Sequence, residues 1–127
     1  MAKLRIICVT GTRERLQMAA MIASVAAASG DDVSVFFSMN ALQYFIKESA
    51  LEPPNEGEFG ALMGNRVPPF RQLFDLAKEF GAATLLPCSM AVDVLSLSRD
   101  DFAVGMGPPT GLTRFLTDAE GALMLTF

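Results

Sequence analysis

The sequence contains no histidine, and this absence excludes several classes of catalytic and metal site. Ser-His-Asp and Cys-His catalysis both need an imidazole, as do the usual zinc sites and any histidine base that works near neutral pH. Only two cysteines are present, Cys8 and Cys88, which are too few for a zinc site or a disulfide-rich scaffold. The acidic residues are dispersed and suggest no metal site. We therefore expect neither a metal nor a cofactor.

Charged residues are also scarce. They make up 19% of the chain, the net charge is −4, and the ten lysines and arginines are scattered rather than clustered. A nucleic-acid surface needs clustered cations that displace counterions from the phosphates, so we expect no nucleic-acid partner. Apolar residues reach 51%, an excess that predicts helices on both faces of a sheet and a subunit interface as well.

A long hydrophobic run is missing too. The longest near-apolar stretch, 18–29, contains two serines and is well short of the roughly 20 apolar residues that a membrane span needs. The first ten residues read as a strand, without the cationic and hydrophobic regions of a signal peptide. These features predict a cytoplasmic protein with no stable membrane insertion.

Short apolar runs alternate with helical patterns along the chain, which is typical of an α/β fold. Strand, helix and strand at this spacing favour right-handed parallel crossovers. We expect a single domain over residues 1–127, a three-layer αβα sandwich whose five-stranded, mostly parallel sheet has the order 2-1-3-4-5. The predicted strands are 4–9, 32–37, 82–86, 102–106 and 122–127, and the predicted helices are 13–29, 39–47, 70–81, 90–97 and 112–119.

Segment 51–69 breaks this pattern with four prolines and three glycines. A loop of this length inside a compact domain is usually a lid, a binding loop or an interface element. The residues leave these three possibilities open.

Cys88 is the candidate reactive group. Ligands of open α/β sheets bind beyond the carboxyl ends of the strands, where the strand order reverses. With the expected order, this point lies between strands one and three, where residues 10–13 and 87–90 meet. Cys88 lies directly before a helix whose N-terminus favours a thiolate, although Asp93 one turn later opposes this effect. The alternative is an inert, packed thiol, because free cysteines are among the most buried residues.

The turn Gly11-Thr12-Arg13 could bind an anion near Cys88 through its backbone N–H groups. The alternative is a plain turn with a solvated arginine, and the turn lacks both the dinucleotide fingerprint and the P-loop lysine. Cys8 lies inside the first strand, where we expect it to pack in the core. If strands one and three are neighbours, the two cysteine Cα atoms lie about 8 Å apart, beyond the roughly 7 Å reach of a disulfide.

Several segments together resemble the DsrE/DsrF-like family of small sulfur-transfer proteins, in particular its peroxiredoxin-annotated DsrE branch. The similarity begins with the apolar first strand, Thr12-Arg13-Glu14-Arg15-Leu16 and the alanine-rich helix, and continues through the second strand at 30–37. It is strongest over 69–97, which includes Cys88-Ser89-Met90-Ala91-Val92-Asp93-Val94. Branch members carry Cys and then Ser-Met-Asp in this stretch, whereas Ala91-Val92 precedes Asp93 here.

The resemblance implies a sulfur carrier or sulfurtransferase whose Cys88 holds a persulfide or thiosulfonate, and a homo-oligomer that is a trimer or larger. The Cys88 thiolate would attack the sulfane sulfur of thiosulfate or a persulfide and pass it to a protein thiol. The backbone amides of Ser89 and Met90, with Thr12 or Arg13 opposite, would stabilise the adduct, and segment 56–69 would cover the site or receive a partner. The alternatives are a non-catalytic carrier, a structural subunit of a sulfur-metabolism complex and, more weakly, a nucleotide-binding protein.

Overall fold

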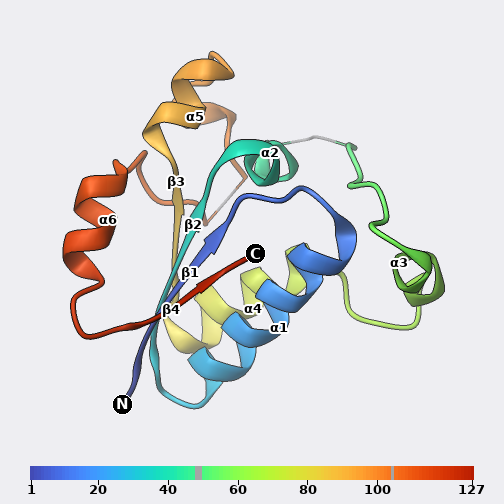
Figure 1. Cartoon of the computed structure of the whole chain (residues 1–127), viewed down its shortest axis with the longest axis horizontal. Coiled ribbons are helices and arrows are strands. Elements are labelled where there is room, and N and C mark those ends of the chain that lie inside the picture. Colours follow the sequence, from blue (N-terminus) through green and yellow to red (C-terminus); the bar gives the residue numbers. More distant parts are fainter. Residues whose placement is uncertain (48–49, 104) are drawn as a thin grey trace.

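The computed structural model describes residues 1–47, 50–103 and 105–127, and a parallel sheet forms its centre (Figure 1). The described residues contain four strands, which lie in the order β3-β2-β1-β4. They are β1 (Lys3–Cys8), β2 (Asp32–Phe37), β3 (Thr84–Pro87) and β4 (Leu123–Thr126). Cys8 pairs with Phe37 and Phe37 with Pro87, so β1, β2 and β3 end at the same edge of the sheet.

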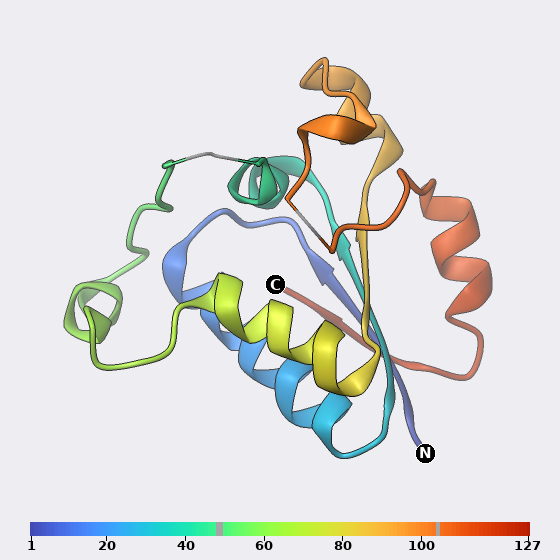
Figure 2. The same cartoon turned by 180° about the vertical axis from the view of Figure 1, so that it is seen from behind.

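Helices cover both faces of this sheet, as the composition predicts. Helices α1 (Arg13–Ala28) and α4 (Phe70–Gly81) lie side by side on one face, and α6 (Leu112–Asp118) lies on the other (Figures 1 and 2). The remaining short helices lie in the connections: α2 (Met39–Leu42), η1 (Gln43–Phe45), α3 (Glu58–Met63), α5 (Ser89–Val94) and η2 (Arg99–Asp101). No helix in the part of the chain that the structure describes is long and apolar enough to cross a membrane.

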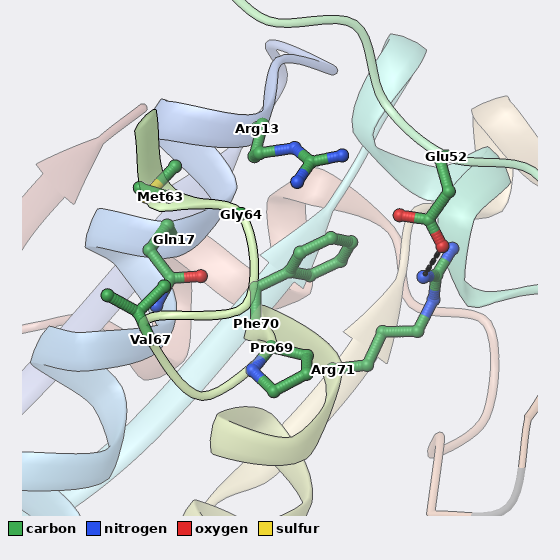
Figure 3. A pocket seen from close by; sticks show the side chains of 9 residues that line it. All are labelled: Arg13, Gln17, Glu52, Met63, Gly64, Val67, Pro69, Phe70 and Arg71. Carbon is green, nitrogen blue, oxygen red and sulfur yellow. Dashed lines mark hydrogen bonds and ion pairs between the residues drawn. The ribbon is translucent and has the colours of Figure 1, made fainter. Parts of the chain in front are cut away.

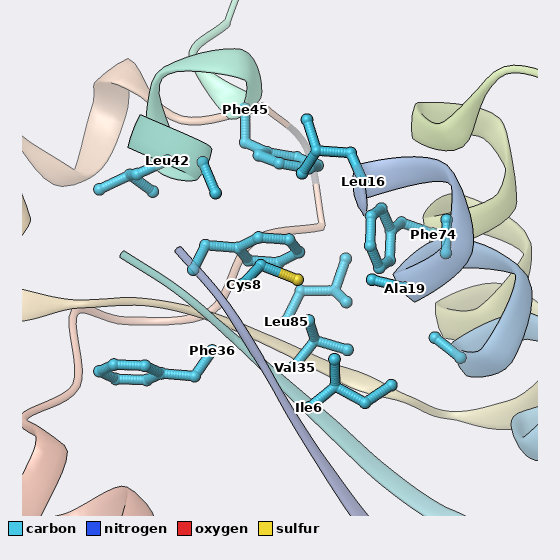
Figure 4. Packing of buried hydrophobic residues seen from close by; sticks show 14 of the residues in the cluster. Ile6, Cys8, Leu16, Ala19, Val35, Phe36, Leu42, Phe45, Phe74 and Leu85 are labelled. Carbon is cyan, nitrogen blue, oxygen red and sulfur yellow. The ribbon is translucent and has the colours of Figure 1, made fainter. Parts of the chain in front are cut away.

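The core forms because successive strand residues point to opposite faces of the sheet. Val35 and Phe37 of β2 pack toward α1 and α4, where the Phe37 ring lies 5.1 Å from the Phe74 ring of α4. Phe36 points to the other face (Figure 4). Its ring lies 4.8 Å from that of Phe115 in α6. The apolar run of β2 is therefore buried on both sides, as expected for a parallel strand between two helical layers.

Helices α1 and α4 touch through their smallest residues. Helix α1 turns alanines inward at Ala19, Ala20, Ala23 and Ala27. A Cβ atom placed on Gly81 of α4 would lie only 2.3 Å from the Cβ of Ala27. The two helices can approach this closely only because position 81 has no side chain.

The observed strand order corrects the predicted order 2-1-3-4-5, because β2 separates β1 from β3 and β4 pairs with the other side of β1. Successive right-handed crossovers on one face add strands in one direction. Since α1 and α4 share a face, β3 is placed beyond β2 rather than beside β1. The chain then returns to β4 through α6 on the opposite face.

The predicted strand 102–106 is also corrected. Phe102 forms an isolated antiparallel bridge with Ile46, Met106 forms a parallel bridge with Leu85 of β3, and Val104 lies outside the described residues. Gly105 has a φ of +102°, which a strand does not use, and two prolines follow at 108–109. This segment reaches the edge of β3 without continuing as a strand.

Candidate functional site

Cys88 occupies the residue between β3 and α5, where its backbone is held on both sides. Its N–H donates to the Phe37 carbonyl at 2.8 Å, and its carbonyl accepts the Val92 N–H at 2.9 Å. It also forms an isolated parallel bridge with Thr110. The residue is 5% exposed and free of any disulfide. The thiol therefore lies at the expected strand-to-helix junction, but it is buried there instead of facing an open crevice.

The segment around Thr110 closes one side of this junction. The Thr110 N–H donates to the Pro87 carbonyl, and the Ser89 N–H donates to the Thr110 carbonyl, both at 2.9 Å. Because its N–H is already used, Ser89 is not positioned to stabilise an anionic adduct on Cys88 through that group.

Met90, by contrast, lies beside a surface groove. The Met90 side chain is 47% exposed, and the neighbouring Val94 is 73% exposed. These residues line a cavity of about 230 Å³ together with Met39, Asn40, Ala91 and Leu95. None of these lining residues is charged, and apolar atoms dominate the groove. Met39 has a φ of 53°, a left-handed conformation that costs a non-glycine residue roughly 1–2 kcal/mol. No sequence signal predicts this groove, since its two halves are some fifty residues apart.

The structure does not bring Thr12 and Arg13 to Cys88. Their turn follows β1, and β2 lies between β1 and β3, so two strand spacings, or about 10 Å, separate the strand ends. Helix α2 fills this interval, because a Cβ on Gly11 would lie 2.7 Å from the Asn40 carbonyl. The predicted meeting of the two turns requires β1 and β3 to be neighbours, and that premise is wrong.

Segment 51–69 is fastened to the start of α1 instead of covering Cys88. The backbone N–H of Arg13 donates to the Pro54 carbonyl at 3.0 Å, and the Gln17 side-chain amide donates to the Pro68 carbonyl at 3.0 Å. Glu56 accepts from Arg15 Nε at 2.7 Å and from the Thr12 hydroxyl at 3.3 Å. Both ends of the segment are thus tied to the same helix.

Glu14 provides a further tie, because its two carboxylate oxygens accept the backbone N–H groups of Glu56 at 2.8 Å and Gly57 at 2.7 Å. These hydrogen bonds lower the pKa of the Glu14 carboxyl below its ordinary 4.5, and the bond from the Glu56 N–H has the largest effect. A carboxyl whose pKa is lower in the folded than in the unfolded protein stabilises the fold, and this stabilisation is complete at pH values above the unfolded-state pKa. That stability is lost as the pH falls through the folded-state pKa.

We expect Glu14→Gln to lower the free energy of unfolding at neutral pH, and this difference to shrink in acid, where wild-type Glu14 is itself protonated. Urea unfolding of the variant and the wild type at neutral and acidic pH measures this difference in the free energy of unfolding. Glu120→Gln, at an exposed position, makes the same chemical change without removing these hydrogen bonds. An equal pH dependence for Glu14→Gln and wild type would contradict the assignment.

Cys8 lies deep in the core, as expected. It is 1% exposed, and burial raises the pKa of its thiol to about 12 (Figure 4). A thiol in this state is a weak nucleophile. Among the described residues there is no group of three or more histidine, cysteine or acidic side chains that could hold a metal ion.

Comparisons with known proteins place this geometry in a family. The family model for the DsrE/DsrF-like family matches residues 3–120. The fold is similar to MTH1491 from Methanobacterium thermoautotrophicum, a protein of unknown function (TM-score 0.73, 9% identity), and to the ychN protein from E. coli (TM-score 0.69, 17% identity). Both similarities cover 100% of each chain, and no curated protein matches the sequence. The chain belongs to the DsrE/DsrF-like family.

Proposed function

We propose that this protein is a cytoplasmic sulfur carrier and sulfurtransferase that holds sulfane sulfur on Cys88. Membership of the family supports a role in sulfur metabolism at the family level. The observation that carries the specific proposal is the position of Cys88 at the carboxyl edge of the sheet, adjoining the helix that presents the apolar groove. Cys8 is a poor candidate for the same role, because burial keeps its thiol protonated.

The proposed reaction is a nucleophilic displacement at sulfur. The Cys88 thiolate attacks the outer sulfur of thiosulfate, a new S–S bond forms, and sulfite leaves with the electron pair of the broken S–S bond. A persulfide donor reacts in the same way and leaves as a thiolate. An acceptor thiolate on another protein then attacks the outer sulfur and releases Cys88.

The surroundings of Cys88 favour a persulfide over a thiosulfonate as the stored species. The residues that line the groove beside α5 are uncharged, the Ser89 N–H is bonded to Thr110, and Thr12 and Arg13 lie beyond β2. A thiosulfonate would bring a bulky anionic group into this uncharged setting, and burying an unpaired charge is unfavourable. A persulfide adds only one sulfur atom, and taking up a single proton removes its charge, so it suits an apolar environment better than a sulfonate that stays ionised.

Exposed apolar side chains support a second element of the proposal, a homo-oligomer. They gather on the outer faces of α1 and α3, at Met18, Met21, Val25, Phe59 and Leu62. Apolar patches of this kind commonly lie at interfaces.

Intact-mass analysis after incubation with thiosulfate or polysulfide tests the proposal. We expect wild-type protein to gain the mass of one sulfur atom, Cys88→Ser to gain none, and Cys8→Ala to behave like wild type. Alanine is the better control at position 8, because a serine hydroxyl would be buried there without an assured partner. A thiol reductant should remove the added sulfur.

A structural subunit with a packed Cys88 is the second candidate, and the 5% exposure of this residue favours it. Alkylation of the native protein separates the two functions. Modification of Cys88 well before global unfolding supports the carrier. If Cys88 reacts only as slowly as Cys8, and no sulfur adduct forms, the carrier proposal fails.

A further inference from the structure

Arg13 faces a cavity that has no part in the proposed sulfur chemistry. The cavity measures about 180 Å³ and is bounded by three parts of the chain. Arg13 and Gln17 come from α1, Phe70 and Arg71 from the start of α4, and the rest from the intervening segment: Glu52, Met63, Gly64, Val67 and Pro69 (Figure 3). The cavity is thus closed by the segment that the hydrogen bonds fasten to α1.

Of the two arginines that line this cavity, one is paired with a carboxylate and the other is not. Each guanidinium nitrogen of Arg71 has a partner: they donate to Glu52 at 2.9 Å, to the Leu51 carbonyl at 2.6 Å and to the Tyr44 carbonyl at 3.0 Å. The Arg13 side chain has no hydrogen-bond or ion-pair partner within 1–47, 50–103 and 105–127, and its Nε atom is buried. Figure 3 shows the Arg13 guanidinium above the Phe70 ring, opposite the Glu52–Arg71 pair.

A buried guanidinium N–H without a partner is unfavourable, because it has lost water and gained nothing in return. Such a group is expected where a ligand supplies the missing acceptor. The Gln17 amide cannot supply it by turning, because its N–H already donates to the Pro68 carbonyl. No acceptor is in place within the described chain, so water or a ligand in the cavity must supply it, and a ligand that fills the cavity takes over this role.

We propose that this cavity binds a small monocarboxylate with an apolar body, whose carboxylate accepts hydrogen bonds from Arg13. An arginine fork matches the two oxygens of a carboxylate. One negative charge is the right number, because Glu52 already neutralises Arg71 and leaves a single unpaired cation. A dianion such as phosphate would place an extra charge beside Glu52.

The walls and size define the apolar body. The Phe70 ring and the side chains of Met63, Val67 and Pro69 offer hydrocarbon surface beside the guanidinium. A dry cavity of about 150 Å³ is known to hold benzene, so 180 Å³ accommodates a six-membered ring. The ligand would contact α1, α4 and the segment between them at once, and would thereby hold the three together.

Sodium benzoate is the probe for this site. In the full-length ¹⁵N-labelled protein at constant ionic strength, benzoate should shift the Arg13 Nε–Hε resonance saturably. Benzamide has the same shape without the charge and should cause no such shift. Inorganic phosphate should bind more weakly than benzoate.

Arg13→Gln should weaken benzoate binding at least about tenfold, the loss expected for a charged hydrogen bond. Arg114→Gln removes the same charge at an exposed position on α6 and should leave affinity within about twofold. Arg13→Met should unfold no more easily than wild type without benzoate, because it removes an unsatisfied buried group.

Three results would overturn the proposal: no shift of the Arg13 signal, an equal shift with benzamide, or undiminished binding by Arg13→Gln. Tighter binding of phosphate than of benzoate would overturn the monocarboxylate assignment. If Arg13→Gln fails to fold, the wild-type titrations still decide the matter. None of these readouts involves Cys88, so the outcome is independent of the sulfur proposal.

Discussion

Phe37→Ala is expected to lower the free energy of unfolding by about 3–5 kcal/mol, the usual range for a fully buried phenylalanine. The Phe37 side chain is completely buried, with ring centroids 4.2 Å from Phe45 and 5.1 Å from Phe74. Its removal leaves a cavity between β2, η1 and α4 that these three elements cannot close without moving. Urea unfolding gives the change, and an unaltered slope against urea concentration would show that the two-state transition is retained.

Phe37→Leu is the matched control, because it keeps most of the buried volume and should cause a much smaller loss. The effect also reaches the candidate site, since the Phe37 carbonyl accepts the Cys88 N–H. We therefore expect Cys88 to be alkylated faster in Phe37→Ala. A loss below about 1 kcal/mol would mean that the core around Phe37 relaxes freely, contrary to the close packing of protein interiors.

Gly81→Ala is also expected to lower the free energy of unfolding substantially, because the added methyl group would overlap Ala27. A Cβ atom at position 81 would lie 2.3 Å from the Ala27 Cβ and 2.6 Å from its carbonyl carbon and oxygen. Two of these three atoms are backbone, so relief requires α1 and α4 to separate. Overpacking of this kind typically costs about 1–3 kcal/mol, and thermal or urea unfolding would measure it.

The neighbouring residue supplies a control of opposite sign. Ala82 ends α4 in a left-handed conformation with a φ of 55°, which glycine adopts without strain. Ala82→Gly should therefore be neutral or stabilise by up to about 1 kcal/mol, after the added freedom of the unfolded chain is counted. If Gly81→Ala lowered the free energy of unfolding no more than Ala82→Gly, the two helices could not be in direct contact at position 81.

The local elements could be predicted from the sequence because their signals are local. Apolar runs locate all four strands that the described residues contain. Gly81 is predicted to end α4, and it is the last residue of the helix, although its packing against Ala27 could not be foreseen. That contact joins α1 and α4 on one face of the sheet, the arrangement that goes with the observed strand order.

The candidate site was only partly predictable for the same reason. The strand-to-helix position of Cys88 follows from its neighbours in sequence, and the structure places it there. Its distance from Thr12 and Arg13 depends on strand order, which no local pattern records. The cavity at Arg13 likewise depends on how segment 51–69 folds back on α1, through hydrogen bonds between residues about forty positions apart.

The alanine and glycine contact between α1 and α4 has a mechanical consequence. Long side chains can change rotamer and absorb a small shift between helices, whereas backbones that touch through hydrogen and methyl groups have no such slack. At this contact the two helices therefore have little freedom to slide past each other. The Arg13 cavity straddles the first turns of the same two helices, so a ligand there acts on a pair whose opposite ends are in direct contact.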